Sequence, residues 1–145
     1  MRVAIGCDPN ASALKKELID ELAGLGHSVD DFGSDDPIYP NVAIDVGESV
    51  AAGNHERGVV LCGTGIGVSI AANKVAGVFC ALVTDVYQAE RAALSNNANV
   101  IAMGAQVTGA SLARVLLRTW IAHSYSDGGR SEAKVNRISE YEANR

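Results

Sequence analysis

Short apolar runs alternate with amphipathic stretches along the chain, and this alternation limits the possible folds more than any other feature of the sequence. The apolar runs have the length of strands, and the stretches between them carry apolar residues at helical spacing, as from Leu14 to Leu25. The predicted strands cover residues 3–5, 28–32, 58–62, 78–83 and 100–103. Strands that alternate with helices form parallel sheets with helices on both faces. We therefore predict a Rossmann-like three-layer α/β/α sandwich with a five-stranded parallel sheet, in a single domain over residues 1–145.

The order of the strands decides which turns lie close together. Right-handed crossovers leave few topologies, and we predict the strand order 2-1-3-4-5. In that order the chain reverses direction between strands 1 and 3, and ligands bind beyond the carboxyl ends of those two strands. The first strand leads there to Asp8, and the third leads to a glycine-rich turn that starts at Cys62. We expect both segments to line one crevice.

Composition and charge exclude several classes of protein. Hydrophobic residues make up 48% of the chain and charged residues 20%, which argues against disorder. With 12 basic and 17 acidic residues the net charge is −5, which disfavours nucleic acid and anionic membrane surfaces as partners. No apolar run approaches the ~20 residues needed to span a bilayer. The three cysteines include no Cys-x-x-Cys pair, so we predict a cytoplasmic protein without a disulfide framework or a metal site.

The segment at residues 62–69, Cys-Gly-Thr-Gly-Ile-Gly-Val-Ser, carries the strongest chemical signal. Alternating glycines allow a sharp turn whose N–H groups point inward, and the helix that follows directs its positive end to the same place. Such a turn can hold an anion. Cys62 lies at its mouth, where these donors favour the thiolate, and Thr64 adds a hydroxyl that can donate and accept protons. A thiolate beside an anion site is a base next to a place for the negative charge that it creates.

Other functions are compatible with the same turn. It could be a plain strand-to-helix connection with Cys62 as a small core residue, as we expect for Cys7 and Cys80. A dinucleotide fingerprint requires glycine where Val68 stands, although Asp85 lies where a ribose-binding acid is expected. A P-loop requires Lys followed by Ser or Thr, which is absent. A sugar-phosphate or nucleotide-binding module without catalysis, and a small dehydrogenase, therefore stay open alternatives.

The sequence resembles the family of type B ribose-5-phosphate isomerases and galactose-6-phosphate isomerase subunits over essentially its whole length. The segments that carry the resemblance are residues 3–8, 39–40, 62–74, 99–104 and 128–130. The resemblance implies aldose–ketose isomerisation of a phosphorylated sugar without metal or organic cofactor. It also implies a homodimer or dimer of dimers whose sites combine residues of two subunits, with the C-terminal tail 125–145 packing at the dimer interface.

The resemblance assigns a role to each candidate site residue. Cys62 is the base that moves a proton between neighbouring carbons, and Thr64 assists proton transfer between the two oxygens. Asp8 and Tyr39 bind sugar hydroxyls, and Asn96 contacts substrate from the other subunit. The backbone from Gly63 to Ser69 stabilises the enediolate, with Gly63, Gly65, Ile66, Gly67 and Ser69 as the contact residues. The phosphate is held by Arg130 and Lys134.

Several departures from the family pattern cluster around ring opening and phosphate binding. Ser95 stands where the family has the ring-opening His, and Pro9 where it has a phosphate-binding His. Ser131 replaces the tail His and Lys134 the second tail Arg, while His27, His55 and His123 are expected at the surface. A tetrulose 4-phosphate needs no ring opening, so it joins ribose 5-phosphate, the family's usual substrate, as a candidate. Alternatively, a paralogous subunit supplies the missing His, as in a heteromeric hexose-6-phosphate isomerase.

Overall fold

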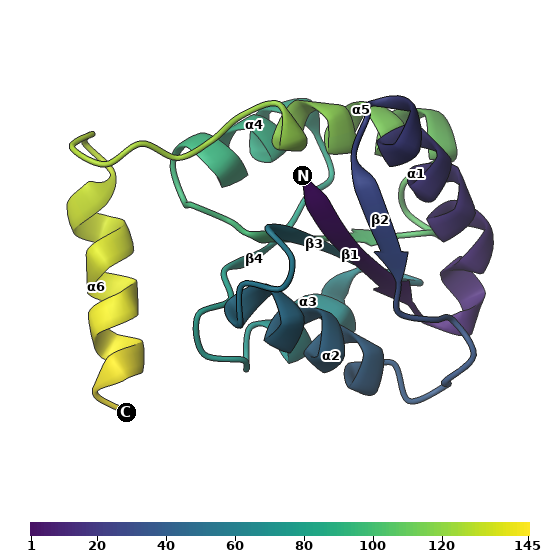
Figure 1. Cartoon of the computed structure of the whole chain (residues 1–145), viewed down its shortest axis with the longest axis horizontal. Helices are drawn as coiled ribbons and strands as arrows, with labels where there is room; N and C mark the ends of the chain where they lie inside the picture. Colours follow the sequence, from purple (N-terminus) through teal and green to yellow (C-terminus); the bar gives the residue numbers. More distant parts are fainter.

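A five-stranded parallel sheet forms the centre of the computed structural model, which describes all residues from 1 to 145 (Figure 1). The strands are β1 (Arg2–Cys7), β2 (Ser28–Asp31), β3 (Arg57–Cys62), β4 (Cys80–Leu82) and β5 (Val100–Gly104). The helices are α1 (Ser12–Gly24), α2 (Pro40–Ala51), α3 (Ile66–Ala72), α4 (Val86–Leu94), α5 (Ala110–Ile121) and α6 (Glu132–Ala143), and the short 3-10 helix η1 covers Pro9–Ala11. The predicted fold class is confirmed.

The strand order is β2-β1-β3-β5-β4, so the predicted order 2-1-3-4-5 is wrong at its last two positions. All five residues of β5 are buried, and β5 pairs with β3 from Gly58↔Val100 to Cys62↔Gly104. The three residues of β4 are only half-buried, and β4 pairs with β5 alone. Both segments are apolar. The inner position has a strand on each side, and it is occupied by β5, the longer and fully buried of the two strands.

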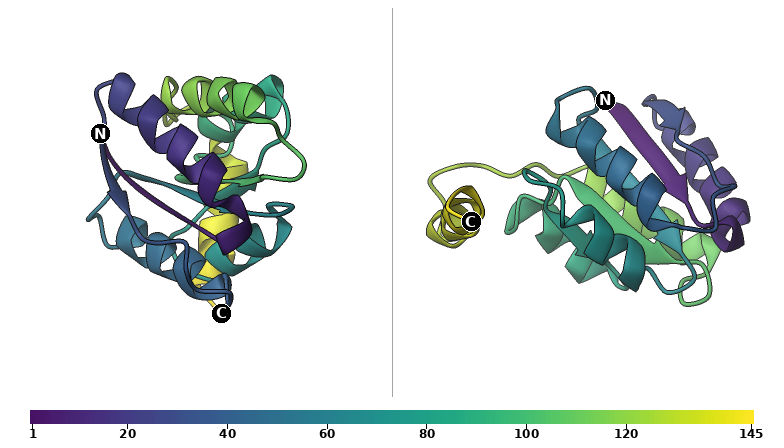
Figure 2. Two further views of the ribbon diagram at one scale, coloured as in Figure 1. Left: turned by 90° about the vertical axis from the view of Figure 1, so that its right-hand side faces the viewer. Right: turned by 90° about the horizontal axis from the view of Figure 1, so that it is seen from below.

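Helices cover both faces of the sheet in the arrangement that strand alternation dictates (Figure 2). Alternate strand residues such as Val3, Ile5 and Leu61 pack against α1, α4 and α5 on one face. The residues between them, including Ala4, Val60 and Cys62, pack against α2 and α3 on the other face. The sulfur of Cys62 therefore lies on the side of the sheet that α2 and α3 cover.

The C-terminal helix α6 stands apart from this sandwich. An extended segment carries the chain past β4, and α6 does not pack against any other helix (Figures 1 and 2). Val135 is its only buried residue. One backbone-to-side-chain hydrogen bond, from the Gly77 N–H to Oε2 of Glu142 (3.0 Å), ties its end to the body. No helix in the chain is both long and apolar enough to cross a membrane.

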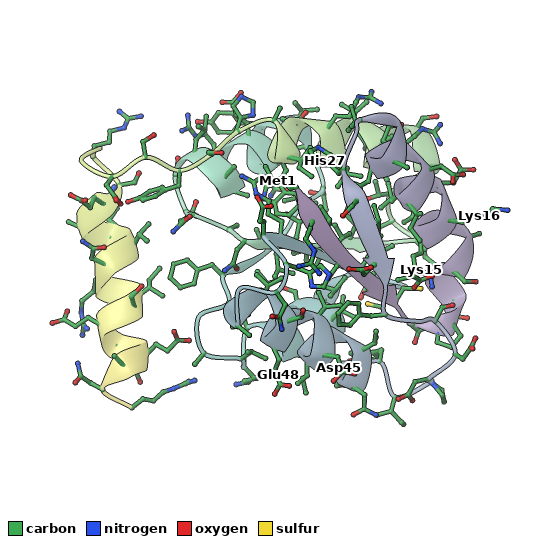
Figure 3. All side chains as sticks on the ribbon, in the orientation of Figure 1. Met1, Lys15, Lys16, His27, Asp45 and Glu48 are labelled. Atoms are coloured by element: carbon green, nitrogen blue, oxygen red, sulfur yellow. The ribbon has the colours of Figure 1, made fainter.

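The predicted surface position is wrong for one of the three histidines. His55 is 6% exposed, with Nδ1 2.6 Å from Ser49 Oγ and Nε2 2.6 Å from Asp30 Oδ2. Because both ring nitrogens have partners, burying the imidazole leaves no polar atom unpaired. His27 and His123 are half-buried, and His27 lies beside Met1 at the start of the sheet (Figure 3).

Candidate active site

The turn between β3 and α3 contains one position at which only glycine fits without strain. Gly65 has a φ of +80°, in the left-handed region. A Cβ atom at this position would lie 2.6 Å from Leu82 Cδ1 and 2.8 Å from the carbonyl carbon of Met103. The turn is therefore pressed against β4 and β5, and its backbone is held in place by the sheet beneath it.

Cys62 ends β3 at the start of this turn and is 6% exposed. The Gly65 N–H donates a hydrogen bond to its Sγ over 3.1 Å. The other two cysteines lie in apolar surroundings, where burial raises the pKa of Cys7 to about 11 and that of Cys80 to about 12. Of the three cysteines, only Cys62 has a sulfur that accepts a backbone N–H.

The turn also presents backbone donors that the chain does not use. The N–H groups already bonded are those of Gly65, to Cys62 Sγ, of Ile66, to Thr64 Oγ1 (3.2 Å), and of Ser69, to Gly65 O (3.2 Å). The N–H groups without a hydrogen bond within the chain belong to Gly63, Thr64, Gly67 and Val68. Successive unpaired N–H groups in a turn form a concave site for an anion.

Two further predicted residues meet the turn from neighbouring segments. The Asp8 N–H donates to Leu61 O (2.9 Å), which places the end of β1 beside the end of β3. Tyr39, just before α2, lies against the first turn of α3, since a Cβ on Gly67 would be only 2.0 Å from its hydroxyl oxygen. Glycine at position 67 thus makes room for the phenol. Asp8, Tyr39 and residues 62–69 lie together at the carboxyl edge, the edge at which the parallel strands end.

Asn96 lies at the opposite edge of the sheet. It precedes β5, whose first residue pairs with Gly58, whereas Cys62 pairs with the last residue of β5. Four residues of strand separate these edges by about 13 Å. Asn96 lines a cavity of about 400 Å³ between β4 and α6, together with Ile138 and Tyr141 of α6. A single chain therefore does not bring Asn96 to the Cys62 turn.

The two predicted phosphate ligands are exposed and belong to the tail. Arg130 lies in the segment before α6 and Lys134 in its first turn, and neither forms a salt bridge within the chain. The nearby cation Arg137 is paired with Glu140, at 3.5 Å. Arg130 and Lys134 are thus among the tail cations that have no anionic partner, and α6 stands away from the Cys62 turn beyond β4 (Figure 1).

The side chains at the altered family positions offer little acid–base chemistry. Ser95 Oγ accepts a hydrogen bond from Arg91 Nε over 2.8 Å, within the end of α4. Pro9 is the exposed first residue of η1. The hydroxyl of Ser69 hydrogen-bonds Cys80, an interaction that lowers the pKa of Cys80 but does not offset the rise from burial. No three His, Cys, Asp or Glu side chains are grouped so that they could hold a metal ion.

Gln106 lies against the turn and was not predicted from the sequence. Its N–H donates to Gly63 O (2.9 Å), and its side-chain oxygen would be 3.5 Å from a Cβ on Gly63. Its position just after β5 could have indicated it, because ligands of α/β proteins bind beyond the carboxyl ends of the strands. The wrong strand order concealed that signal, since it placed β4 between β3 and β5, whereas β5 lies directly beside β3.

The fold and the site define an α/β protein with a thiol and a turn of unpaired backbone N–H groups at the switch point of its sheet. The family model described as Ribose/Galactose Isomerase matches residues 3–138. The chain is 44% identical to D-erythrulose-4-phosphate isomerase of Pectobacterium atrosepticum, over 98% of this chain and 95% of that protein. It is 45% identical to Ribose-5-P isomerase B of Listeria innocua, over 97% and 96%.

A solved structure agrees with these relatives. Ribose-5-Phosphate Isomerase B of Clostridium thermocellum superimposes with a TM-score of 0.94 at 39% identity, covering 99% of each chain. The chain belongs to the ribose/galactose isomerase family, and it is a sugar-phosphate isomerase. The resemblance inferred from the glycine turn is confirmed, and the binding-module and dehydrogenase alternatives are not supported.

Proposed function

We propose that this enzyme interconverts a tetrulose 4-phosphate and the corresponding aldose phosphate, with Cys62 as the base. The observation that carries the proposal is the pairing of the Cys62 sulfur with the Gly65 N–H, 3.1 Å away, beside four unpaired backbone donors. A base needs a site for the charge that it creates, and here the two are parts of one turn.

The reaction needs one proton to leave carbon and return to its neighbour. The Cys62 thiolate removes a proton from the carbon next to the carbonyl. The electron pair of that C–H bond forms the carbon–carbon double bond of the enediolate, and the carbonyl π electrons move onto oxygen. Thr64 passes a proton between the two oxygens, and the thiol returns its proton to the former carbonyl carbon. No electron is gained or lost overall, so the chemistry is balanced within the substrate.

The unpaired N–H groups of the turn stabilise the enediolate oxygens in this proposal. Gly63, Thr64, Gly67 and Val68 supply them, because the N–H groups of Gly65, Ile66 and Ser69 are already bonded. One preorganised donor of this kind contributes about 2.7–4 kcal/mol to a developing oxyanion. Asp8 and Tyr39 bind sugar hydroxyls from the two sides of the turn. Gln106, above Gly63, is placed to join them.

Completion of the site requires a second copy of the chain. Asn96 lies at the far edge of its own sheet, and Arg130 and Lys134 lie on a tail that stands apart from it. The apolar side chains Ile66 and Ile70 of α3 are 52% and 57% exposed, which suits an interface beside the turn. We propose a homodimer in which the tail 125–145 of each copy packs against its partner and delivers the phosphate ligands.

The absence of the family's ring-opening His supports a substrate with four carbons. A sugar that carries phosphate on the oxygen of its fourth carbon cannot close a five-membered ring, so no acid–base group is needed to open one. Ser95, held by Arg91 Nε, takes the position of the family's ring-opening His. The Pectobacterium relative named for D-erythrulose 4-phosphate supports this choice. Ribose 5-phosphate is the second candidate, supported by the similarly identical Listeria relative.

Assays on the purified chain alone test the substrate and the base together. We expect efficient turnover of a tetrulose 4-phosphate, with kcat/KM at least 100-fold above that for ribose 5-phosphate, and incorporation of solvent deuterium on carbon seen by NMR. Cys62→Ser should lower kcat by about 10²–10⁴-fold while substrate still binds. Cys80→Ser, a change in the half-buried cysteine of β4, is the matched control and should retain activity.

Each part of the proposal has its own contrary result. If the enzyme prefers ribose 5-phosphate, the proposed substrate is wrong, but the role of Cys62 as base is unaffected. Full activity of Cys62→Ser would remove Cys62 from the reaction. Activity that appears only after a paralogous subunit is added would show a heteromeric enzyme. A monomer with full activity would contradict the shared site.

A further inference from the structure

Tyr39 is carried by a segment without regular structure, and its position over the turn needs an explanation. Residues 32–39, between β2 and α2, contain no helix or strand. The Tyr39 side chain packs against the apolar cluster between the sheet and helices α2 and α3, and its hydroxyl lies over Gly67. The position that the phenol reaches also depends on the backbone that carries Tyr39, which belongs to no helix or strand.

The carboxylate of Asp36 is hydrogen-bonded to residues on both sides of Tyr39. Oδ1 of Asp36 accepts the Ile38 N–H (2.8 Å), and Oδ2 accepts a hydrogen bond from Asn41 Nδ2 (2.9 Å). The Asn41 N–H donates in turn to Ile38 O (3.0 Å). Tyr39 thus lies between two residues that are both tied to Asp36. Asp36 is fully exposed, and the hydrogen bonds from Asn41 and Ile38 lower the pKa of its carboxyl, so that both oxygens are acceptors at neutral pH.

The start of the same loop is fixed to the site independently. Oδ1 of Asp31 accepts hydrogen bonds from Lys15 Nζ and from the Gly33 N–H, both at 2.8 Å. Gly33 O accepts the Cys7 N–H (3.1 Å), one residue before Asp8. The loop is therefore anchored beside Asp8 at its beginning. Near its end, the only hydrogen bonds to a side chain are those that Asp36 accepts.

We propose that Asp36 is a positioning residue that holds Tyr39 in place over the first turn of α3, so that its hydroxyl meets the substrate. Asp36 itself does not touch the substrate. This inference rests on the proposed substrate contact of Tyr39. Asn41 acts with Asp36 as the donor that ties the loop to the start of α2.

A double-mutant cycle measures the connection between the two residues. Tyr39→Phe should raise KM with kcat nearly unchanged, because a hydroxyl contact made in both ground and transition states changes binding uniformly. Asp36→Ala should raise KM by about three- to tenfold, the effect of losing hydrogen bonds of ordinary strength. In the double variant, KM should be no higher than in the more affected single variant, because residues that act through one contact are not additive.

Two variants of the same loop serve as controls. Asp35→Ala removes the neighbouring exposed carboxylate, which makes no hydrogen bond, and should leave KM unchanged. Asp36→Asn keeps an acceptor for the Ile38 N–H, and the Asn41 amide can rotate to accept from the new amide, so KM should return close to that of the unmodified enzyme. Additive effects in the cycle, or an equal rise of KM in Asp35→Ala, would overturn the proposal.

A spectroscopic measurement separates this inference from the proposed function. In protein labelled with 3-fluorotyrosine, the ¹⁹F resonance that Tyr39→Phe removes belongs to Tyr39. Asp36→Ala should shift or broaden that resonance and leave those of the other tyrosines in place, whereas Asp35→Ala should change none. An unmoved Tyr39 resonance in Asp36→Ala contradicts the positioning role. A moved resonance with KM unchanged in Tyr39→Phe keeps the positioning role and removes the substrate contact of Tyr39.

Discussion

The turn that carries Cys62 and the C-terminal helix α6 are built in opposite ways. The turn packs closely against β4 and β5. The N–H groups of Gly65 and Ile66 donate hydrogen bonds within the turn itself. Helix α6 is joined by an extended segment and has one buried residue, Val135. The only buried side-chain polar atom without a partner, the Tyr125 hydroxyl, lies in that same segment. The turn is fixed by its own chain and leaves four backbone N–H groups unpaired, whereas α6 has few contacts with the rest of its chain.

This difference separates two parts of the chemistry. Proton transfer requires groups held within fractions of an ångström, and the proposed base Cys62 and the unpaired N–H groups lie on one short turn over the sheet. Phosphate binding tolerates longer, exposed cations, and the proposed phosphate ligands lie on the tail. We infer that enolisation is encoded in each chain, whereas phosphate recognition arises on assembly. The following changes test this division, from the largest expected effect to the smallest.

Removal of residues 125–145 should abolish efficient catalysis while the sandwich stays folded. Loss of two charge-assisted contacts to phosphate, each of about 1.5–3 kcal/mol, lowers kcat/KM by about 10²–10⁴-fold. Far-UV circular dichroism should keep the signal of the remaining helices, and sedimentation should show a monomer. Arg130→Gln in the full chain isolates one cation and should raise KM, whereas Arg137→Gln, already paired with Glu140, should not. An unfolded truncated chain would contradict the division.

Gly65→Ala should damage stability and activity together. A non-glycine residue at a φ of +80° costs about 1–2 kcal/mol, and overlap with the backbone of Met103 adds about 1–3 kcal/mol. Chemical denaturation should therefore show a loss of about 2–5 kcal/mol. Gly24→Ala is the control, because a Cβ there meets nothing within 4 Å at the end of α1. Equal stability of the two variants would show that the turn is not held by the sheet.

Lys15→Met should weaken the carboxyl edge more than the same change at the next residue. Lys15 has a side chain only 7% exposed and bonds Asp31, whereas Lys16 points away into solvent (Figure 3). Loss of this half-buried pair should cost about 1–2 kcal/mol in the free energy of unfolding, and Lys16→Met should stay within about 0.5 kcal/mol. Similar losses from both variants would remove the special role of Lys15.

The smallest expected effect is a change in acid stability. Burial raises the pKa of Asp31, but the hydrogen bonds from Lys15 and Gly33 outweigh it and lower that pKa below its ordinary value of 3.8. The stabilisation is therefore present above about pH 4 and is lost as the pH falls through the folded-state pKa. Between pH 5 and about pH 2.5, Asp31→Asn should lose less stability than the unmodified chain. Asp20→Asn, on the exposed face of α1, should follow the unmodified chain.

Local patterns in the sequence were enough for much of this description. The alternation of apolar runs and amphipathic stretches predicted the parallel sandwich, because side-chain periodicity depends only on neighbouring residues. The glycines of residues 62–69 predicted the turn, since its backbone conformation excludes other residues. The ends of β1 and β3, which carry Asp8 and Cys62, lie side by side as expected, because these two strands pair as predicted. Tyr39 was expected there only from the family resemblance.

Other features depend on contacts between segments distant in the chain. The two apolar runs that became β4 and β5 are alike in sequence, and competition for the inner position of the sheet placed β5 beside β3. That placement brings Gln106 to the turn, just as Ser49 and Asp30 allow His55 to be buried. The unpaired N–H groups and the separation of α6 are likewise visible only in three dimensions. Each of these outcomes is set by the balance of packing and hydrogen bonding across the whole fold, which no short stretch of sequence contains.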